Sequence, residues 1–245
     1  MKLLEATLNV VKSRGEALFI DISRPYAYTM LAQFDDKKFF LKVSQDSEQI
    51  SVSSLKDLKI LSAYTNANSL CIVSSLKGHV LQRGVAYIKD NVTFISLATF
   101  KDLLDGRMPY LRLNRGFISA AIDGEKLRRA REEVGMSLGA LAEELGVSRE
   151  TVYRYERGEI EAPLRVAQRL ISLFGEDVVK KIEISSKITQ EELSSRKIED
   201  GVYRLVDSHP DALKVKDGIR LISHSQDKYE KTVELANALG VEVER

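Results

Sequence analysis

The chain of 245 residues lacks the features of several common protein classes. It has one cysteine, Cys71, and three histidines, so an intramolecular disulfide is impossible, and no cluster has zinc-ligand spacing. Its apolar runs reach only strand length, so neither a membrane span nor an export signal is expected. Four prolines and 14 glycines exclude collagen-like and low-complexity classes. We therefore expect a folded, cytoplasmic protein.

A charge of one sign is also missing. The 37 basic and 36 acidic side chains give a formal net charge of +1, which gives no global indication of a nucleic-acid or membrane partner. The positive surplus is local and includes Arg107, Arg112 and Arg115. We therefore predict a basic linker over residues 108–123.

Signs of a catalytic centre are scarce. Neither G-x-G-x-x-G nor the P-loop pattern occurs, which excludes the common phosphate-binding loops. Cys71 lies in an apolar run with no histidine beside it in sequence, so it is interpreted as a core residue. His79, His209 and His224 are scattered along the chain. No cofactor, no metal and no catalytic residue are therefore expected.

Residues 1–107 alternate between helical and strand-like patterns. This order predicts an α/β domain with a mixed central sheet. Asp35 and Asp36 are expected in a polar turn. The expected elements are a helix through Leu3 and Val11 that ends at Gly15, strands over 17–23, 26–34 and 38–43, a helix capped by Ser53 or Ser54, strands over 70–73 and 85–95, and a helix over 97–104.

From residue 124 to 180 the pattern changes to short helices with tight joints. Ser137 can cap one helix, Gly146 can end it in the left-handed conformation, and Ser148 can cap the next. This arrangement predicts a helix-turn-helix. Val152 and Tyr155 would hold its second helix against the first. Five side chains would then face outward: Arg149, Glu150, Tyr153, Arg154 and Arg157.

This segment resembles the Cro/C1 (XRE) family and, more narrowly, archaeal predicted transcriptional regulators of that family. The resemblance covers about a fifth of the chain and implies an all-α domain, usually dimeric, whose third helix reads base edges. On the matching positions, Arg149, Glu150, Tyr153 and Arg154 would face bases, and Arg157 and Arg165 would face phosphates. Ser148, at the start of the same helix, is also expected to be among the DNA-binding residues. Leu138 departs from the pattern, because the family often has a glutamine there for a phosphate contact.

The N-terminal element order resembles the restriction-endonuclease-like fold. Active members have Pro-Asp before one strand and an acidic-x-Lys on the next, so that two carboxylates hold Mg²⁺. The matching positions here are Pro25-Tyr26 and Phe40-Leu41-Lys42, of which only Lys42 fits. Asp21, Asp35 and Asp36 are the other carboxylates nearby. The domain is therefore expected to be an inactive scaffold.

Residues 181–245 are expected to form a small α/β segment. Thr189 and Glu192 have the spacing of a capping box, strands are predicted over 202–206 and 218–223, and Gly240 would end a helix over 227–239 before a short final strand. The segment could sense an effector, mediate dimerisation or cover the sheet. The sequence does not decide among these roles.

Together these patterns predict a double-stranded DNA-binding transcriptional regulator, a homodimer on a palindromic site, with no membrane contact and no identified small-molecule effector. Two alternatives remain open: a metal-dependent nuclease targeted by its helix-turn-helix, and a protein-binding coactivator. Arg128, Arg129 and Arg131 fit a solvated helix face and a phosphate contact equally well.

Overall fold

The computed structural model describes residues 2–114, 116–184 and 186–245, which divide into two compact units. The first unit combines Met1–Arg83 and Ile88–Asp105 with the C-terminal Ile184–Arg245. The second contains Gly84–Tyr87 and Gly106–Glu183. The C-terminal segment is therefore part of the first unit, and the helix-turn-helix is inserted in the middle of that unit's sequence.

A mixed sheet forms the centre of the first unit, as the sequence predicts. Its strand order is β1-β2-β3-β4-β7, with antiparallel pairing from β1 to β3 and parallel pairing from β3 through β4 to β7; β5 pairs with the end of β4. The strands are β1 (Glu16–Ile20), β2 (Met30–Phe34), β3 (Lys37–Asp46), β4 (Ala67–Leu76), β5 (His79–Val80) and β7 (Val92–Ile95).

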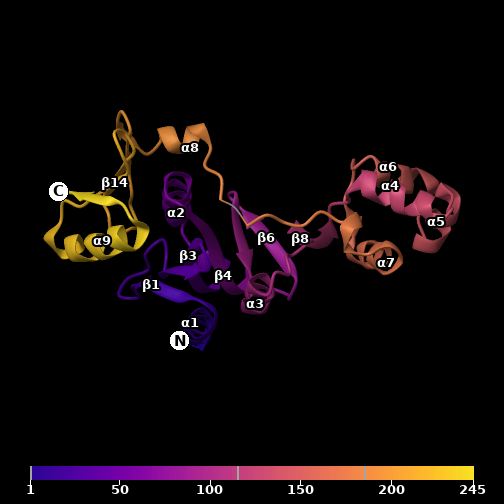
Figure 1. Ribbon diagram of the computed structural model, residues 1–245, viewed down its shortest axis with the longest axis horizontal. Helices are drawn as coiled ribbons and strands as arrows, with labels where there is room; N and C mark the ends of the chain where they lie inside the picture. The colour runs from indigo at the N-terminus through magenta and orange to yellow at the C-terminus, as the bar shows by residue number, and fades with distance from the viewer. Residues whose placement is uncertain (1, 115, 185) are drawn as a thin grey trace. The chain divides into compact units, whose positions relative to one another are not determined.

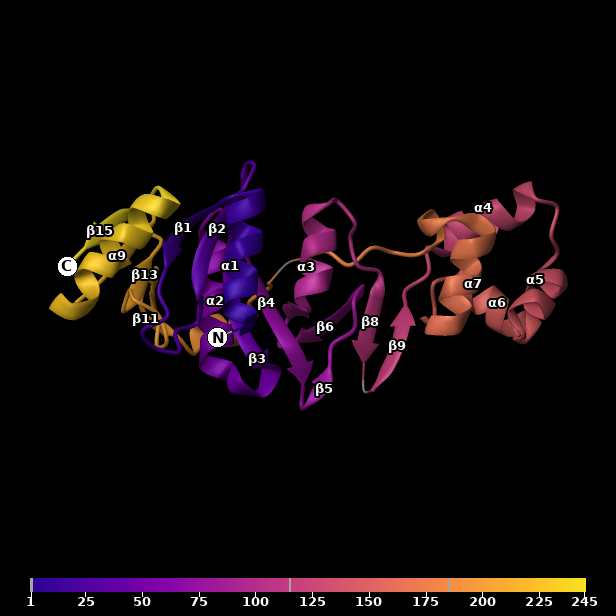
Figure 2. The same cartoon turned by 90° about the horizontal axis from the view of Figure 1, so that it is seen from below.

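Helices cover both faces of this sheet. Figures 1 and 2 show α1 (Lys2–Arg14) and α3 (Leu97–Leu104) on one face and α2 (Val52–Tyr64) on the other. A one-turn 3-10 helix, η1 (Ser47–Gln49), precedes α2. Fully buried side chains fill the layers between, among them Phe40 and Cys71. Burial raises the pKa of the Cys71 thiol to about 12, in keeping with its predicted place in the core.

Several predicted element boundaries up to residue 95 were wrong; the strand predicted over 17–23, for example, ends at Ile20. The strand predicted over 26–34 starts only at Met30, because the amide of Ala27 donates to the carbonyl of Asp207 instead of to a neighbouring strand. The run 85–95 forms two strands, β6 (Val85–Lys89) and β7, because Asp90 and Asn91 both adopt positive φ in a turn. The cap of α2 is Ser51, whose Oγ accepts from the amide of Ser54 at 2.9 Å.

The C-terminal part of the first unit is a five-stranded sheet with one long helix. Strand order is β11-β12-β13-β14-β15, antiparallel except for the parallel pair β14 and β15. The predicted capping box of Thr189 and Glu192 and the left-handed Gly240 are confirmed. The elements are α8 (Gln190–Ser194), β11 (Lys197–Glu199), β12 (Val202–Arg204), β13 (Ala212–Lys214), β14 (Arg220–Ile222), α9 (Gln226–Leu239) and β15 (Glu242–Glu244).

The prediction that residues 108–123, in the second unit, form a linker was wrong. Residues 108–123 contain two antiparallel strands, and Arg112 lies on the first of them; Arg115 is outside the described residues. The local basic surplus of these residues favours a linker, and each of the two strands is only four residues long. The elements after β6 are β8 (Leu111–Asn114), β9 (Phe117–Ala120), α4 (Gly124–Glu133), α5 (Leu138–Leu145), α6 (Arg149–Glu156), β10 (Ala162–Pro163), α7 (Leu164–Phe174) and η2 (Glu176–Val178).

Strands of this unit pair in the order β6-β8-β9-β10. The pairing of Ala162 with Ala120 joins the helical part to the hairpin, and the amide of Asp123 donates to the carbonyl of Val178. No helix in the described parts of the chain is both long and apolar enough to cross a bilayer.

Candidate nucleic-acid interface

Helices α5 and α6 form the predicted helix-turn-helix. The Oγ of Ser137 caps α5 by accepting from the amide of Ala140 at 3.0 Å. Gly146 ends α5 with φ 64° and ψ 40°, a left-handed conformation that costs glycine little because it has no Cβ. Ser148 then caps α6 by accepting from the amide of Thr151 at 3.1 Å. These three local signals therefore set the turn between the helices.

Apolar packing holds α6 in place. Val152 and Tyr155 are buried, as predicted, and so are Leu141 and Leu145 of α5, the helix that contacts α6. The start of α4 comes so close to the end of α6 that a Cβ added at Gly124 would lie 2.2 Å from the carbonyl oxygen of Glu156. The tight approach fixes the axis of α6, so the opposite face of the helix has a defined direction.

A buried ion pair joins the same two helices. Arg131 of α4 donates from Nε to Glu156 Oε1 at 2.5 Å and from Nη2 to Oε2 at 3.1 Å, with side chains only 9% and 6% exposed. Arg131 also donates to the carbonyl of Met136 at 2.8 Å. The hydrogen bond to Glu156 raises the pKa of Arg131. Arg131 is therefore neither a solvated side chain nor a phosphate ligand, whereas Arg128 and Arg129 lie on the exposed face and pair with Glu132 and Glu125.

The exposed side of α6 carries the side chains that the sequence placed there. Arg149, Glu150, Tyr153, Arg154 and Arg157 are all exposed. Within residues 2–114, 116–184 and 186–245, the side chains of Arg149 and Glu150 make no hydrogen bond or ion pair. The structure thus brings these side chains together on one helix face.

A carboxylate that the sequence reading missed holds two of these arginines. Glu159 Oε1 lies 2.7 Å from Arg157 Nε, and its Oε2 lies 3.7 Å from Arg154 Nε. Arg157 also donates to the hydroxyl of Tyr153 at 3.2 Å, and this hydrogen bond raises its pKa. The sequence spacing of Glu159 and Arg154 did not predict this contact, because it depends on the turn at Gly158, where φ is 66°. Both guanidinium groups are therefore held side by side beside the end of α6.

The structure also places the other positions that the sequence analysis singled out in this domain, Ser148, Arg165 and Leu138. Ser148 uses its Oγ as the helix cap and lies exposed at the start of α6. Arg165 is exposed in the first turn of α7. Leu138, the departure from the family pattern, is the first residue of α5 and lines a hollow with Arg149, Glu150 and Tyr153.

The nuclease positions of the first unit are closed by the C-terminal segment. Lys42 is buried and donates from Nζ to the carbonyl of Tyr26, and burial lowers its pKa. Tyr26 packs its ring 4.0 Å from that of His209, which lies 3.1 Å from Asp21. Burial lowers the pKa of His209. No group of three or more potential metal ligands occurs among the described residues.

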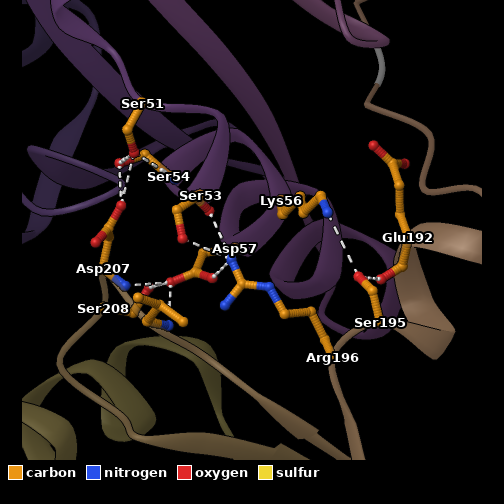
Figure 3. Close-up of polar contacts among 11 residues, drawn as sticks. Ser51, Ser53, Ser54, Lys56, Asp57, Glu192, Ser195, Arg196, Asp207 and Ser208 are labelled. Carbon is orange, nitrogen blue, oxygen red and sulfur yellow. Dashed lines mark hydrogen bonds and ion pairs between the residues drawn. The ribbon is translucent and has the colours of Figure 1, made fainter.

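A second carboxylate, Asp57, organises this closure (Figure 3). It is fully buried on α2, and its Oδ2 accepts from the amides of Val206 and Asp207 and from the hydroxyl of Ser208 at 2.7–3.0 Å. Its Oδ1 lies 3.4 Å from Arg196. Sequence reading missed Asp57 because all of its partners come from residues far along the chain.

The same segment also covers the first turn of α2. The carboxylate of Asp207 accepts from the hydroxyls of Ser51 and Ser54, both at 2.8 Å (Figure 3). Lys59, fully buried on the same helix, pairs with Glu192 of α8. The segment therefore serves as cover for α2 and the adjoining sheet, one of the roles that the sequence left open.

Comparison with known proteins matches both parts of the chain. Residues 1–109 match the PD-(D/E)XK superfamily domain, and residues 127–181 match a helix-turn-helix family. No solved structure matches the chain.

Several archaeal proteins match the chain. A protein of Pyrobaculum aerophilum named "Putative HTH-type transcriptional regulatory protein" is 62% identical over 100% of this chain and 98% of its own length. Proteins with the same name from Methanocaldococcus jannaschii and Archaeoglobus fulgidus are each 29% identical, over 71% and 78% of this chain. The matches span only 56% and 63% of those two relatives. The chain therefore belongs to the family of these archaeal HTH-type transcriptional regulatory proteins, with a PD-(D/E)XK superfamily domain followed by a Cro/C1-type helix-turn-helix.

Proposed function

We propose that the protein is a cytoplasmic transcriptional regulator that binds double-stranded DNA sequence-specifically and reads a palindromic site as a homodimer. The observation that carries the proposal is the exposed face of α6, where Arg149, Tyr153 and Arg154 project from a helix whose axis is fixed by packing. Arginine can bind guanine O6 and N7 together in the major groove. Because residues 124–175 contain equal numbers of basic and acidic side chains, specific base contacts should contribute much of the discrimination.

The small size of the proposed reading surface supports a homodimer. One helix of eight residues can present only a few side chains to base edges. Two copies related by a twofold axis would read two half-sites about one helical turn apart, which requires a palindromic sequence. Sedimentation of the free protein and of its DNA complex tests this stoichiometry, and one protomer per bound site would contradict it.

DNA binding is tested first by selecting bound sequences from a random duplex library. We expect a palindromic consensus. Arg154→Ala should weaken binding to that consensus by about 1–3 kcal/mol and relax the preference at one base pair per half-site. Arg129→Ala is the matched control, since Arg129 is an exposed arginine of the same unit that pairs with Glu125. Equal losses on consensus and random DNA would contradict base reading by Arg154.

Arg157 is expected to contact phosphate. Arg157→Ala should weaken binding to all duplexes similarly and lower the slope of affinity against salt by about one ion per contact. If the slope of affinity against salt is unchanged in Arg157→Ala, Arg157 does not contact a phosphate. If both Arg149→Ala and Arg154→Ala left every DNA measurement unchanged, the protein-binding coactivator would be the better description.

We further propose that the PD-(D/E)XK domain does not cleave DNA. Tyr26 and Phe40 stand where active members have carboxylates, and Lys42 is engaged by a backbone carbonyl. The rival nuclease is favoured by the superfamily match and by the retained lysine. A cleavage assay with Mg²⁺ or Mn²⁺ separates the two. Cutting that disappears in Lys42→Ala would overturn the proposal.

A further inference from the structure

A hollow lies on the exposed side of the helix-turn-helix, between the start of α5 and α6. Its walls are Leu138, Arg149, Glu150 and Tyr153, all within the second unit. Leu138 is half-buried and the Tyr153 side of the hollow is open, with 44% of that residue exposed. An apolar surface is therefore available beside the arginine that is expected to read bases.

The two sides of the hollow differ in chemistry. The Leu138 side chain and the Tyr153 ring are apolar, whereas Arg149 and Glu150 bring a cation and an anion. The Glu150 carboxylate would repel a phosphate placed in the hollow, because two anions would then approach each other with little solvent between them. A base edge that combines an apolar group with neighbouring polar atoms suits these walls better.

Only one natural base edge in the major groove carries such an apolar group. Thymine presents its C5-methyl beside the O4 acceptor, while the edges of the other three bases present only donors and acceptors. The adjoining polar side chains fit the neighbouring base pair, since arginine binds guanine O6 and N7 and glutamate accepts from cytosine N4.

We propose that this hollow receives the C5-methyl group of a thymine and that Leu138 determines the preference for it. The inference rests on the proposed function and names the base that this site selects. It also accounts for the departure at Leu138, where a side chain that cannot bind phosphate offers an apolar contact instead.

The test removes the methyl group from the DNA. In the consensus selected from the library, each thymine in turn is replaced by deoxyuridine, which lacks only that methyl. We expect about a fourfold loss of affinity at one position per half-site, the effect of burying one methyl group. The protein is unchanged in this experiment, so misfolding cannot produce the result.

A second arm places the effect at Leu138. Leu138→Ala should bind the thymine and deoxyuridine sites with nearly equal affinity, and Val134→Ala should discriminate as the unmodified protein does. Val134 is the control because it is an apolar residue of the same unit, 60% exposed, outside the hollow.

The outcomes separate the two proposals. If no consensus is selected, the proposed function fails and the inference fails with it. The methyl inference is wrong, and the proposed DNA binding is unaffected, in two cases. In the first, a consensus is selected but deoxyuridine lowers the affinity at no position. In the second, Leu138→Ala still prefers thymine to deoxyuridine as strongly as the unmodified protein does.

Discussion

Two helices of this protein begin in the same way and have different surroundings. Ser51 caps α2 and Ser148 caps α6, each accepting from an amide three residues on, at 2.9 and 3.1 Å. Above the start of α2 lies the carboxylate of Asp207, bound by two serine hydroxyls. The start of α6 is exposed, with Arg149 and Glu150 beside the cap.

The difference shows what local sequence decides and what it does not. A serine cap fixes where a helix begins in both units. An anion near a helix N-terminus is stabilised by the partial positive charge there, and in α2 the chain supplies that anion itself. Whether a helix end is available to a partner is therefore decided by residues distant in sequence. The following predictions test this contrast, from the largest expected effect to the smallest.

Asp57→Ala should have the largest effect on the closed helix. It removes the acceptor for Val206, Asp207 and Ser208 and leaves the buried Arg196 without its carboxylate. The free energy of unfolding should fall by about 3–5 kcal/mol in a urea titration. Asp200→Ala, at an exposed ion pair of the same unit, is the control and should change little. A small loss in Asp57→Ala would mean that the C-terminal segment is held by its apolar contacts.

The same carboxyl should make stability depend on pH. Burial raises the pKa of Asp57 from 3.8 to about 6, so the folded chain holds this proton more tightly than the unfolded chain does. Its contribution to stability is present below about pH 4 and declines as the pH rises through about 6. Asp57→Asn cannot titrate, so the unfolding free energy of the unmodified protein minus that of the variant should fall by about 3 kcal/mol across this window. A constant difference would contradict the raised pKa.

Asp207→Ala opens the start of α2. It removes a charged acceptor from the hydroxyls of Ser51 and Ser54, and we expect a loss of about 2 kcal/mol. Asp207→Asn keeps a neutral acceptor and should lose less. If both variants are as stable as the unmodified protein, the covered helix end contributes nothing and the contrast with α6 has no energetic basis.

Ser148→Ala should have the smallest effect, about 1 kcal/mol, because it removes one cap from α6. Ser148→Asp sharpens the comparison, since aspartate caps equally well and places at α6 the charge that Asp207 places at α2. Its stability should match that of the unmodified protein while its affinity for duplex DNA falls, measured by fluorescence anisotropy. Unchanged affinity would indicate that the start of α6 lies away from the phosphates.

Much of the helix-turn-helix was predictable because its determinants are local. Ser137, Gly146 and Ser148 each act within four residues of their own position, and the buried Val152 and Tyr155 follow helical spacing. The mixed sheet was predictable from alternating patterns for the same reason. The outward side chains of α6 then follow from helix geometry alone.

What could not be predicted depends on long-range partners. Arg131 has the sequence context of a surface arginine, but it is buried in an ion pair with Glu156, which lies 25 residues further along the chain. The closure by Asp57, Asp207 and His209 joins positions more than 140 residues apart, or nearly 190 in the case of Asp21 and His209. No pattern of spacing indicates such pairs. The β8–β9 hairpin was missed because its two strands are only four residues long.

The insertion of the second unit within the sequence of the first sets the order in which the two units can fold on the ribosome. All residues of the second unit, Gly84–Tyr87 and Gly106–Glu183, are synthesised before Ile184–Arg245. The second unit can therefore fold while the first unit still lacks its C-terminal segment. Domains generally fold as units during synthesis. The second unit should therefore fold before Asp57 of the first unit has its partners, which are the amides of Val206 and Asp207 and the side chain of Arg196. The N-terminal sheet would then be completed only after the C-terminal segment has been synthesised.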